Sequence, residues 1–221
     1  MNKAHHSNYD GATTARCERA LVTLLGDLGP WRERVYLAGG LAPRYIIGRL
    51  PDGARTHVGT TDVDLVIGIA LGDETPEAYR TLQNNLQKAH FKQGQPSFSW
   101  SRDVDGALVV VEFLCETNQV DAGNIFHPKG EQTGSKLSAL NIRGALLVRN
   151  DFVERDIEGE RLDGGGFSRV GLRVANLLPY TVLKIFAFQE RHENKDAYDL
   201  IFTLLRAHDL ITGVGELGDT V

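Results

Sequence analysis

The chain has 221 residues, of which 42% are hydrophobic, and a formal net charge of −5. This length and apolar fraction suffice for a substantial buried core, built as one domain or as one domain with an accessory lobe. The negative net charge excludes a generally cationic surface for binding nucleic acid, so any polyanion must bind at a local basic cleft.

The two cysteines, Cys17 and Cys115, lie far apart in the sequence. They favour neither a disulfide framework nor a zinc site, and they fit a reducing compartment. The N-terminus carries no apolar run typical of a signal peptide, and nowhere do about 18 apolar residues follow one another. We therefore expect a cytoplasmic protein that does not span a membrane.

The first half of the chain alternates predicted helices and strands. Residues 13–29 carry leucines at helical spacing and end at Gly29 and Pro30, so they predict a helix. A short strand ending in two glycines, a short helix, a loop, a β-branched strand and a further helix follow, at residues 34–40, 41–50, 51–60, 61–70 and 75–90.

The second half opens with a predicted hairpin, whose strands are Ser97 to Arg102 and Ala107 to Cys115. The polar, glycine-containing interval from Thr117 to Leu140 predicts a loop. Residues 144–166 suggest a second hairpin, and residues 177–210 predict a long helical region with Pro179 in its first turn. The pattern indicates an α+β fold.

Two aspartates interrupt the predicted strand at residues 61–70. Asp62 and Asp64 are two residues apart, so a strand projects both carboxylates from one face. Unpaired carboxylates beside an apolar sheet are costly, so they should be solvated at a strand edge, paired with cations or holding a metal. All three interpretations stay open on the aspartates alone.

The context of the aspartates favours the metal. A turn at Gly39 and Gly40 between strand and helix would offer backbone N–H groups to phosphate oxygens, and magnesium commonly bridges carboxylates to substrate phosphates. Glu112 places a charge inside the apolar run "LVVVEFL" and is the candidate third carboxylate, with a salt-bridged sheet residue as the alternative.

These residues resemble the DNA polymerase beta-like nucleotidyltransferase superfamily, whose motif is a GG or GS turn, a DxD and a later acidic strand residue. Within it the chain looks most like the AbiEii-type nucleotidyltransferases, known as abortive-infection and type IV toxin proteins. The additional resemblance is "KIFAFQERHENKDAYDL", which is similar to that group's pattern of a lysine, an arginine and then KDxxDL. The match spans roughly residues 35–205.

The resemblance implies a nucleotidyltransferase fold, a mixed β-sheet with flanking helices, plus a C-terminal helical lobe. Residues 1–117 would form the core, and residues 118–221 a hairpin extension and the lobe, packed as one unit with it. The implied activity is metal-dependent transfer of NMP from an NTP, such as ATP, to a hydroxyl of RNA, specifically a tRNA 3′ end, in a toxin-antitoxin or phage-defence setting. A cognate antitoxin or toxin would be a further partner.

Site roles follow from the same resemblance. Mg²⁺ or Mn²⁺ would be held by three carboxylates, and the nucleotide would be held by the glycine turn, a hydroxyl and a set of cations. The expected metal ligands are Asp62, Asp64 and Glu112, which are also catalytic together with Lys184. The expected nucleotide-binding residues are Gly39, Gly40, Thr60, Lys184, Arg191 and Lys195.

The three cations also stand out by spacing. On one continuous helix Lys184, Arg191 and Lys195 fall at i, i+7 and i+11 and line one stripe, with an ordinary solvated face as the alternative. The segment "HEN" would instead break the helix. Asp196 and Asp199 would then pair with Arg191 or Lys195, either holding those cations in place or forming simple helix salt bridges.

Several features carry weaker hypotheses. His57 lies beside the proposed site in the sequence, and we interpret it as a solvated loop histidine. The arginines of the middle segment predict either a basic wall for RNA or solvated hairpin faces offset by acidic neighbours, and the second interpretation is favoured. They are Arg143, Arg149, Arg155, Arg161, Arg169 and Arg173.

Two rival functions remain. The same chemistry would serve a protein hydroxyl or a small molecule such as an aminoglycoside as acceptor. A chain of this kind would alternatively act as a non-catalytic module that binds a nucleotide or a partner.

Overall fold

The computed structural model describes residues 11–48, 50, 57, 60, 62–67, 76–128 and 136–212. Within these ranges only the backbone is described at residues 30, 31, 64–67, 76–78 and 208–212. Most of the predicted loop at residues 51–60 therefore lies outside the described residues, as do the ends of the strand predicted at residues 61–70.

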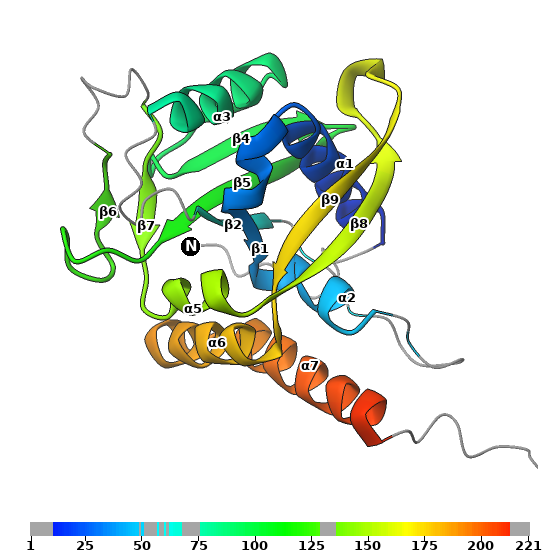
Figure 1. Ribbon diagram of the computed structural model, residues 1–221, viewed down its shortest axis with the longest axis vertical. Coiled ribbons are helices and arrows are strands. Elements are labelled where there is room, and N and C mark those ends of the chain that lie inside the picture. The colour runs from blue at the N-terminus through cyan, green and yellow to red at the C-terminus, as the bar shows by residue number, and fades with distance from the viewer. Residues whose placement is uncertain are drawn as a thin grey trace, which may run out of the picture.

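The described strands form one mixed sheet, in the order β3-β4-β5-β2-β1-β9-β8, with β7 pairing to β5 and β6 to β7 (Figure 1). Their bounds are β1 Val35–Ala38, β2 Asp62–Ile67, β3 Lys92–Gln93, β4 Ser99–Val104, β5 Ala107–Cys115, β6 Ile125–Phe126, β7 Ala139–Asn141, β8 Phe152–Glu160 and β9 Phe167–Ala175. β1 runs antiparallel to β2 and parallel to β9, whereas β2 and β5 are parallel. The hairpin β8–β9 thus extends the sheet that carries β1 and β2.

Helices lie on both sides of the sheet (Figure 1). Their bounds are α1 Gly11–Gly26, α2 Pro43–Ile46, α3 Pro76–Lys88, α5 Ala145–Asn150, α6 Leu177–Arg191 and α7 Asn194–Thr212, with single 3₁₀ turns at Gly29–Arg34, Gly39–Leu41 and Leu162–Gly164. α1 contacts β5, β8, β9 and α3. α5 and α6 contact each other, α5 also contacts β5 and β9, and α6 also contacts β9. The architecture is α+β, as predicted.

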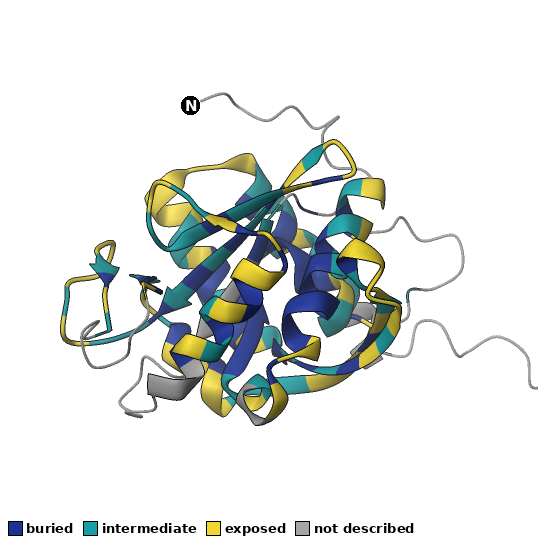
Figure 2. Cartoon of the chain, turned by 90° about the horizontal axis from the view of Figure 1, so that it is seen from above, coloured by how far each residue is buried: buried dark blue, intermediate teal, exposed yellow. Residues whose placement is uncertain are grey.

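The alternation of side chains along β5 decides which face is dry. Val109, Val111, Phe113 and Cys115 are fully buried, whereas the residues between them are only half-buried or exposed. Their core partners include Leu21, Leu24 and Leu25 of α1, which have the helical spacing seen in the sequence. Figure 2 shows the buried residues gathered where the sheet meets the helices. The other face of β5 carries Leu108, Val110, Glu112 and Leu114, so Glu112 is its one charged residue.

Two predicted segments are wrong in part. Residues 145–150, which the sequence predicts as part of the second hairpin, form α5. Gly144 precedes this helix with a φ of +86°, and Ala145 and Val148 pack into the core. The hairpin itself begins at Phe152 and is confirmed. The predicted loop after Thr117 contains β6 and the start of β7, the latter fixed by the side chain of Asn141, which bonds the backbone of Thr117 and Val120.

The first hairpin is confirmed, with its turn at Asp105 and Gly106, both at positive φ. Positive φ at both central residues is the geometry of a tight two-residue hairpin turn. Pro179 lies in the first turn of α6, as predicted. Among the described helices, none combines the length and apolar character that crossing a lipid bilayer requires.

Candidate functional site

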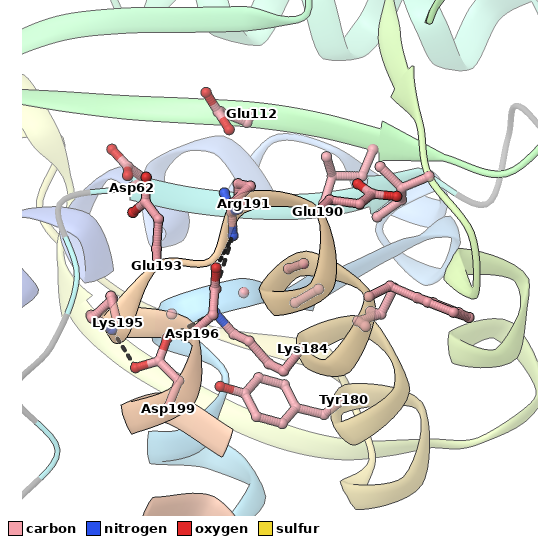
Figure 3. A pocket seen from close by; sticks show the side chains of 18 of the residues that line it. Asp62, Glu112, Tyr180, Lys184, Glu190, Arg191, Glu193, Lys195, Asp196 and Asp199 are labelled. Carbon is pink, nitrogen blue, oxygen red and sulfur yellow. Dashed lines mark hydrogen bonds and ion pairs between the residues drawn. The ribbon is translucent and has the colours of Figure 1, made fainter. Parts of the chain in front are cut away.

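Two of the three predicted carboxylates come together on the face of the sheet opposite α1. Asp62 is the first residue of β2, and Glu112 lies in the parallel neighbour β5, where Asp62 is opposite Val110 and Asp64 is opposite Glu112. Because Val111 and Phe113 face the core, Glu112 lies on the other face, and it lines the same cavity as Asp62 (Figure 3). The Asp64 side chain lies outside the described residues.

The turn requires glycine at both of its positions, for a different physical reason at each. Gly39 adopts a φ of +68°, which disfavours other residues. At Gly40 a Cβ atom would lie 2.8 Å from Thr60 Oγ1, so any side chain would collide with Thr60. Thr60 is itself buried, and its hydroxyl accepts a hydrogen bond from the Asp62 N–H at 3.2 Å. Thr60 therefore fixes both the turn and the start of β2.

The predicted cations come from two helices and not from one. α6 ends at Arg191, His192 takes a left-handed φ of +55°, and α7 begins at Asn194, so the break at "HEN" is confirmed and the continuous stripe is wrong. Lys184, Arg191 and Lys195 nevertheless all line the cavity with Asp62 and Glu112.

Two buried aspartates of α7 bind all three cations. Lys184 Nζ donates to Asp196 Oδ1 at 3.0 Å and to Asp199 Oδ2 at 2.8 Å, and the Arg191 guanidinium contacts both oxygens of Asp196. Lys195 pairs with Asp199 one helical turn away. The sequence indicated the pairs of Arg191 and Lys195, but not that Lys184 lies between both carboxylates.

The ionisation of Asp199 is set by these contacts. Burial by itself would raise the pKa of the Asp199 carboxyl. The hydrogen bond from His57 and the charges of Lys184 and Lys195 outweigh burial and hold this pKa well below its usual range. Asp199 is therefore an anion at neutral pH, whereas burial lowers the pKa of its partner Lys195. We call Lys184, Arg191 and Lys195, together with the two aspartates that they contact, the cation cluster.

His57 corrects the interpretation from sequence. Its side chain is only 2% exposed, and its Nε2 lies 2.8 Å from Asp199 Oδ1. Its ring lies 5.4 Å from the ring of Tyr198 and 5.1 Å from that of Phe202. It is thus a buried residue docked on α7, because the aromatic side chains of α7 give the ring an apolar surface. A lone histidine in a polar loop carried no periodic signal for this.

The cavity is lined by both polar and apolar side chains. Its volume is about 240 Å³. Figure 3 shows Asp62 and Glu112 at one side, and Lys184, Asp196 and Asp199 at the other. The sequence did not indicate the apolar lining residues. They are Leu114, Leu140, Ile142, Leu183, Phe186 and Ala187, and Arg143 and Glu190 are among the polar residues of the same cavity.

Three of the six middle arginines form ion pairs away from the cavity. Arg169 pairs with Asp156 and Glu158, Arg173 with Glu154, and Arg161 with Asp27. The pairs of Arg169 and Arg173 follow the favoured interpretation of hairpin faces offset by acidic neighbours, whereas the partner of Arg161 lies just after α1. Arg143 alone of the six predicted arginines lines the cavity.

The donor set at the cavity suits a hard divalent cation. Asp62 and Glu112 offer carboxylate oxygens, and magnesium typically takes one or two carboxylates together with waters and substrate phosphates. Among the side chains that the structure describes, no group of three acidic, histidine or cysteine residues is arranged to hold a metal ion. Asp64, the predicted third ligand, is not among those side chains.

Comparisons with known proteins identify no relative. Scans of the chain against protein-family models, curated proteins and solved structures found no match in any of the three.

Proposed function

We propose that the chain is a metal-dependent nucleotidyltransferase with the nucleotidyltransferase fold, transferring NMP from an NTP to a hydroxyl group. The observation that carries this proposal is that one cavity is lined by Asp62 and Glu112, by the Gly39–Gly40 turn and by the cation cluster. Carboxylates for a divalent cation and cations for phosphates are the two halves that such a site requires.

The reaction forms a bond between the acceptor oxygen and the α-phosphorus and breaks the bond from that phosphorus to the bridging oxygen of pyrophosphate. Pyrophosphate leaves, and the acceptor proton passes to Glu112 as base. Lys195 and Arg191 bind the phosphates of the leaving pyrophosphate, and Lys184 neutralises the negative charge that develops on the pyrophosphate. Bound Mg²⁺ or Mn²⁺ would be held by Asp62, Asp64 and Glu112 and would supply charge neutralisation on the phosphates.

For the acceptor we favour RNA, and specifically a tRNA 3′ end, in a toxin-antitoxin or phage-defence role with a cognate partner. This choice rests on the sequence resemblance to AbiEii-type enzymes. A protein hydroxyl or a small molecule is the alternative acceptor. A non-catalytic nucleotide-binding module is the second candidate function, and the engagement of Lys184 by two carboxylates favours it, because a paired lysine binds phosphate less readily.

Labelled NTPs and separate pools of RNA, protein and aminoglycoside test the proposal directly. We expect label in the RNA pool, dependent on divalent cation and lost by at least about 100-fold in Asp62→Asn and in Glu112→Gln. Asp156→Asn is the matched control, because Asp156 is an exposed carboxylate whose partner is Arg169 on the hairpin. Label in a different pool would change the acceptor but keep the chemistry.

The absence of label in every pool would reject transfer. Calorimetry then tests for the non-catalytic nucleotide-binding module. Such a module would bind MgNTP without turnover, and Asp62→Ala and Asp64→Ala would leave this binding unaffected. A toxin role predicts that induced expression arrests growth and that Asp64→Ala relieves the arrest. Arrest that survives this substitution would mean that toxicity does not come from nucleotidyl transfer.

A further inference from the structure

The hydrogen bond between His57 and Asp199 joins two distant parts of the chain. The two residues are 142 positions apart, and their side chains are 2% and 1% exposed. His57 precedes β2, whereas Asp199 lies in the second turn of α7. The contact therefore joins His57, which precedes β2 in the chain, to α7, the helix that carries Lys195.

The chemistry of Asp199 fixes the proton on His57. Asp199 Oδ2 accepts from Lys184, and Oδ1 contacts both Lys195 and His57. A carboxylate among these donors is ionised and only accepts hydrogen bonds, so His57 Nε2 must carry the hydrogen. Burial lowers the pKa of His57, and the nearby lysines lower it further against the effect of Asp199. The imidazole is therefore neutral, in its Nε2–H tautomer.

Residues close in sequence to His57 and to Asp199 lie at the candidate site. Thr60, three residues after His57, is buried against Gly40 and bonds the Asp62 backbone. Lys195, which pairs with Asp199, has its Nζ 3.5 Å from the place where a Cβ on Gly40 would lie. One carboxylate thus contacts both His57 and the lysine beside the glycine turn.

We propose that His57 is a positioning residue, which donates its Nε2 hydrogen to Asp199 and thereby holds Lys195 against the Gly39–Gly40 turn for phosphate binding. The inference rests on the proposed function, because it assigns the phosphate end of that same site. His57 acts through Asp199 and does not itself touch the substrate.

Inorganic tripolyphosphate with Mg²⁺ is the probe, since its binding does not depend on turnover or on the acceptor. His57→Phe keeps an aromatic ring between Tyr198 and Phe202 but cannot donate, whereas His57→Gln keeps an N–H donor. We expect His57→Phe to weaken binding about tenfold and His57→Gln to stay within about threefold. His127→Phe, an exchange at an exposed histidine, is the control and should bind like the wild type.

Kinetics and NMR complete the test. With MgNTP, His57→Phe should raise KM about tenfold and change kcat less than threefold, because phosphate contacts in the ground and transition states are lost alike. Imidazole ¹⁵N spectra of the wild type should show hydrogen on Nε2 of His57 at neutral pH. This measurement uses the wild type alone, so it does not depend on whether a variant folds. Hydrogen on Nδ1 alone, or tripolyphosphate binding by His57→Phe equal to that of the wild type, would overturn the inference.

Failure of the proposed function gives a different pattern. A wild type that binds tripolyphosphate in a His57-dependent manner but labels no acceptor rejects transfer and keeps the positioning role. A wild type that transfers NMP with the same KM as His57→Phe keeps transfer and rejects the positioning role.

Discussion

Replacing Lys184 by methionine tests whether the cation cluster stabilises the fold. The Lys184 side chain is 9% exposed, and its ammonium lies between Asp196 and Asp199, whose side chains are 3% and 1% exposed. Removing one partner of a buried ion pair typically costs about 3–5 kcal/mol. Because Asp196 keeps Arg191 and Asp199 keeps Lys195, we expect the lower end, about 3 kcal/mol in the free energy of unfolding.

Thermal and urea unfolding followed by circular dichroism measures this cost. For a domain of 150–250 residues 1 kcal/mol shifts Tm by about 2–4 °C, so Lys184→Met should lower Tm by about 6–12 °C. Lys88→Met at the exposed end of α3 is the matched control and should stay within about 0.5 kcal/mol.

The pH dependence of the unfolding free energy is a second test with the same Lys184→Met variant. The folded pKa of Asp199 is depressed, so its stabilisation is present above the unfolded value of about 3.9 and is lost as pH falls through the folded pKa. Without Lys184 this depression shrinks, so the stability difference between the variant and the wild type should be constant near pH 7 and narrow below about pH 4. A variant as stable as Lys88→Met would refute the reasoning.

Three further predictions concern the turn, the buried histidine and a cysteine. Gly40→Ala should destabilise the protein by about 1–3 kcal/mol in urea unfolding, because the new Cβ would lie 2.8 Å from Thr60 Oγ1, and Thr60→Ala should recover part of this loss; an unchanged midpoint would contradict the collision. The folded pKa of His57 lies below its unfolded value of about 6.5, so its contribution to stability is present above pH 6.5 and is lost as pH falls. Wild type should therefore lose more stability than His57→Phe between pH 7 and pH 5, by at most about 1.4 kcal/mol per pH unit, and parallel pH profiles would reject this assignment. Burial raises the pKa of the Cys115 thiol to about 12, so iodoacetamide should alkylate it only in denaturant, as followed by mass spectrometry; rapid alkylation of the native protein would show that the thiol is accessible.

Patterns of short range made most of the fold predictable. The leucines of α1, the hairpin β4–β5 and the helical region after Asn176 were all visible as periodicity and turn signals, because these depend on neighbouring residues. α5 and β7 were missed. A six-residue helix and a three-residue strand are stabilised by packing and by the side chain of Asn141, which local patterns do not encode.

The candidate site divides in the same way. Asp62, Asp64, Gly39 and Gly40 stand out in the sequence because a charge in an apolar strand and a pair of glycines at a strand end are locally unusual. Glu112 stood out for the same reason, but only strand order decides that β5 is the parallel neighbour of β2 and sets Glu112 opposite Asp64.

The sequence by itself therefore determined which residues are chemically out of place, since a buried charge or a glycine at a turn is costly wherever the chain goes. The tertiary structure alone decided their partners. Lys184 pairs with two aspartates, and His57 binds Asp199 from 142 residues away, because the packing of α7 against α6 and α2 brings these groups out of water together. Contacts between distant segments depend on how whole elements pack, and no local pattern carries that information.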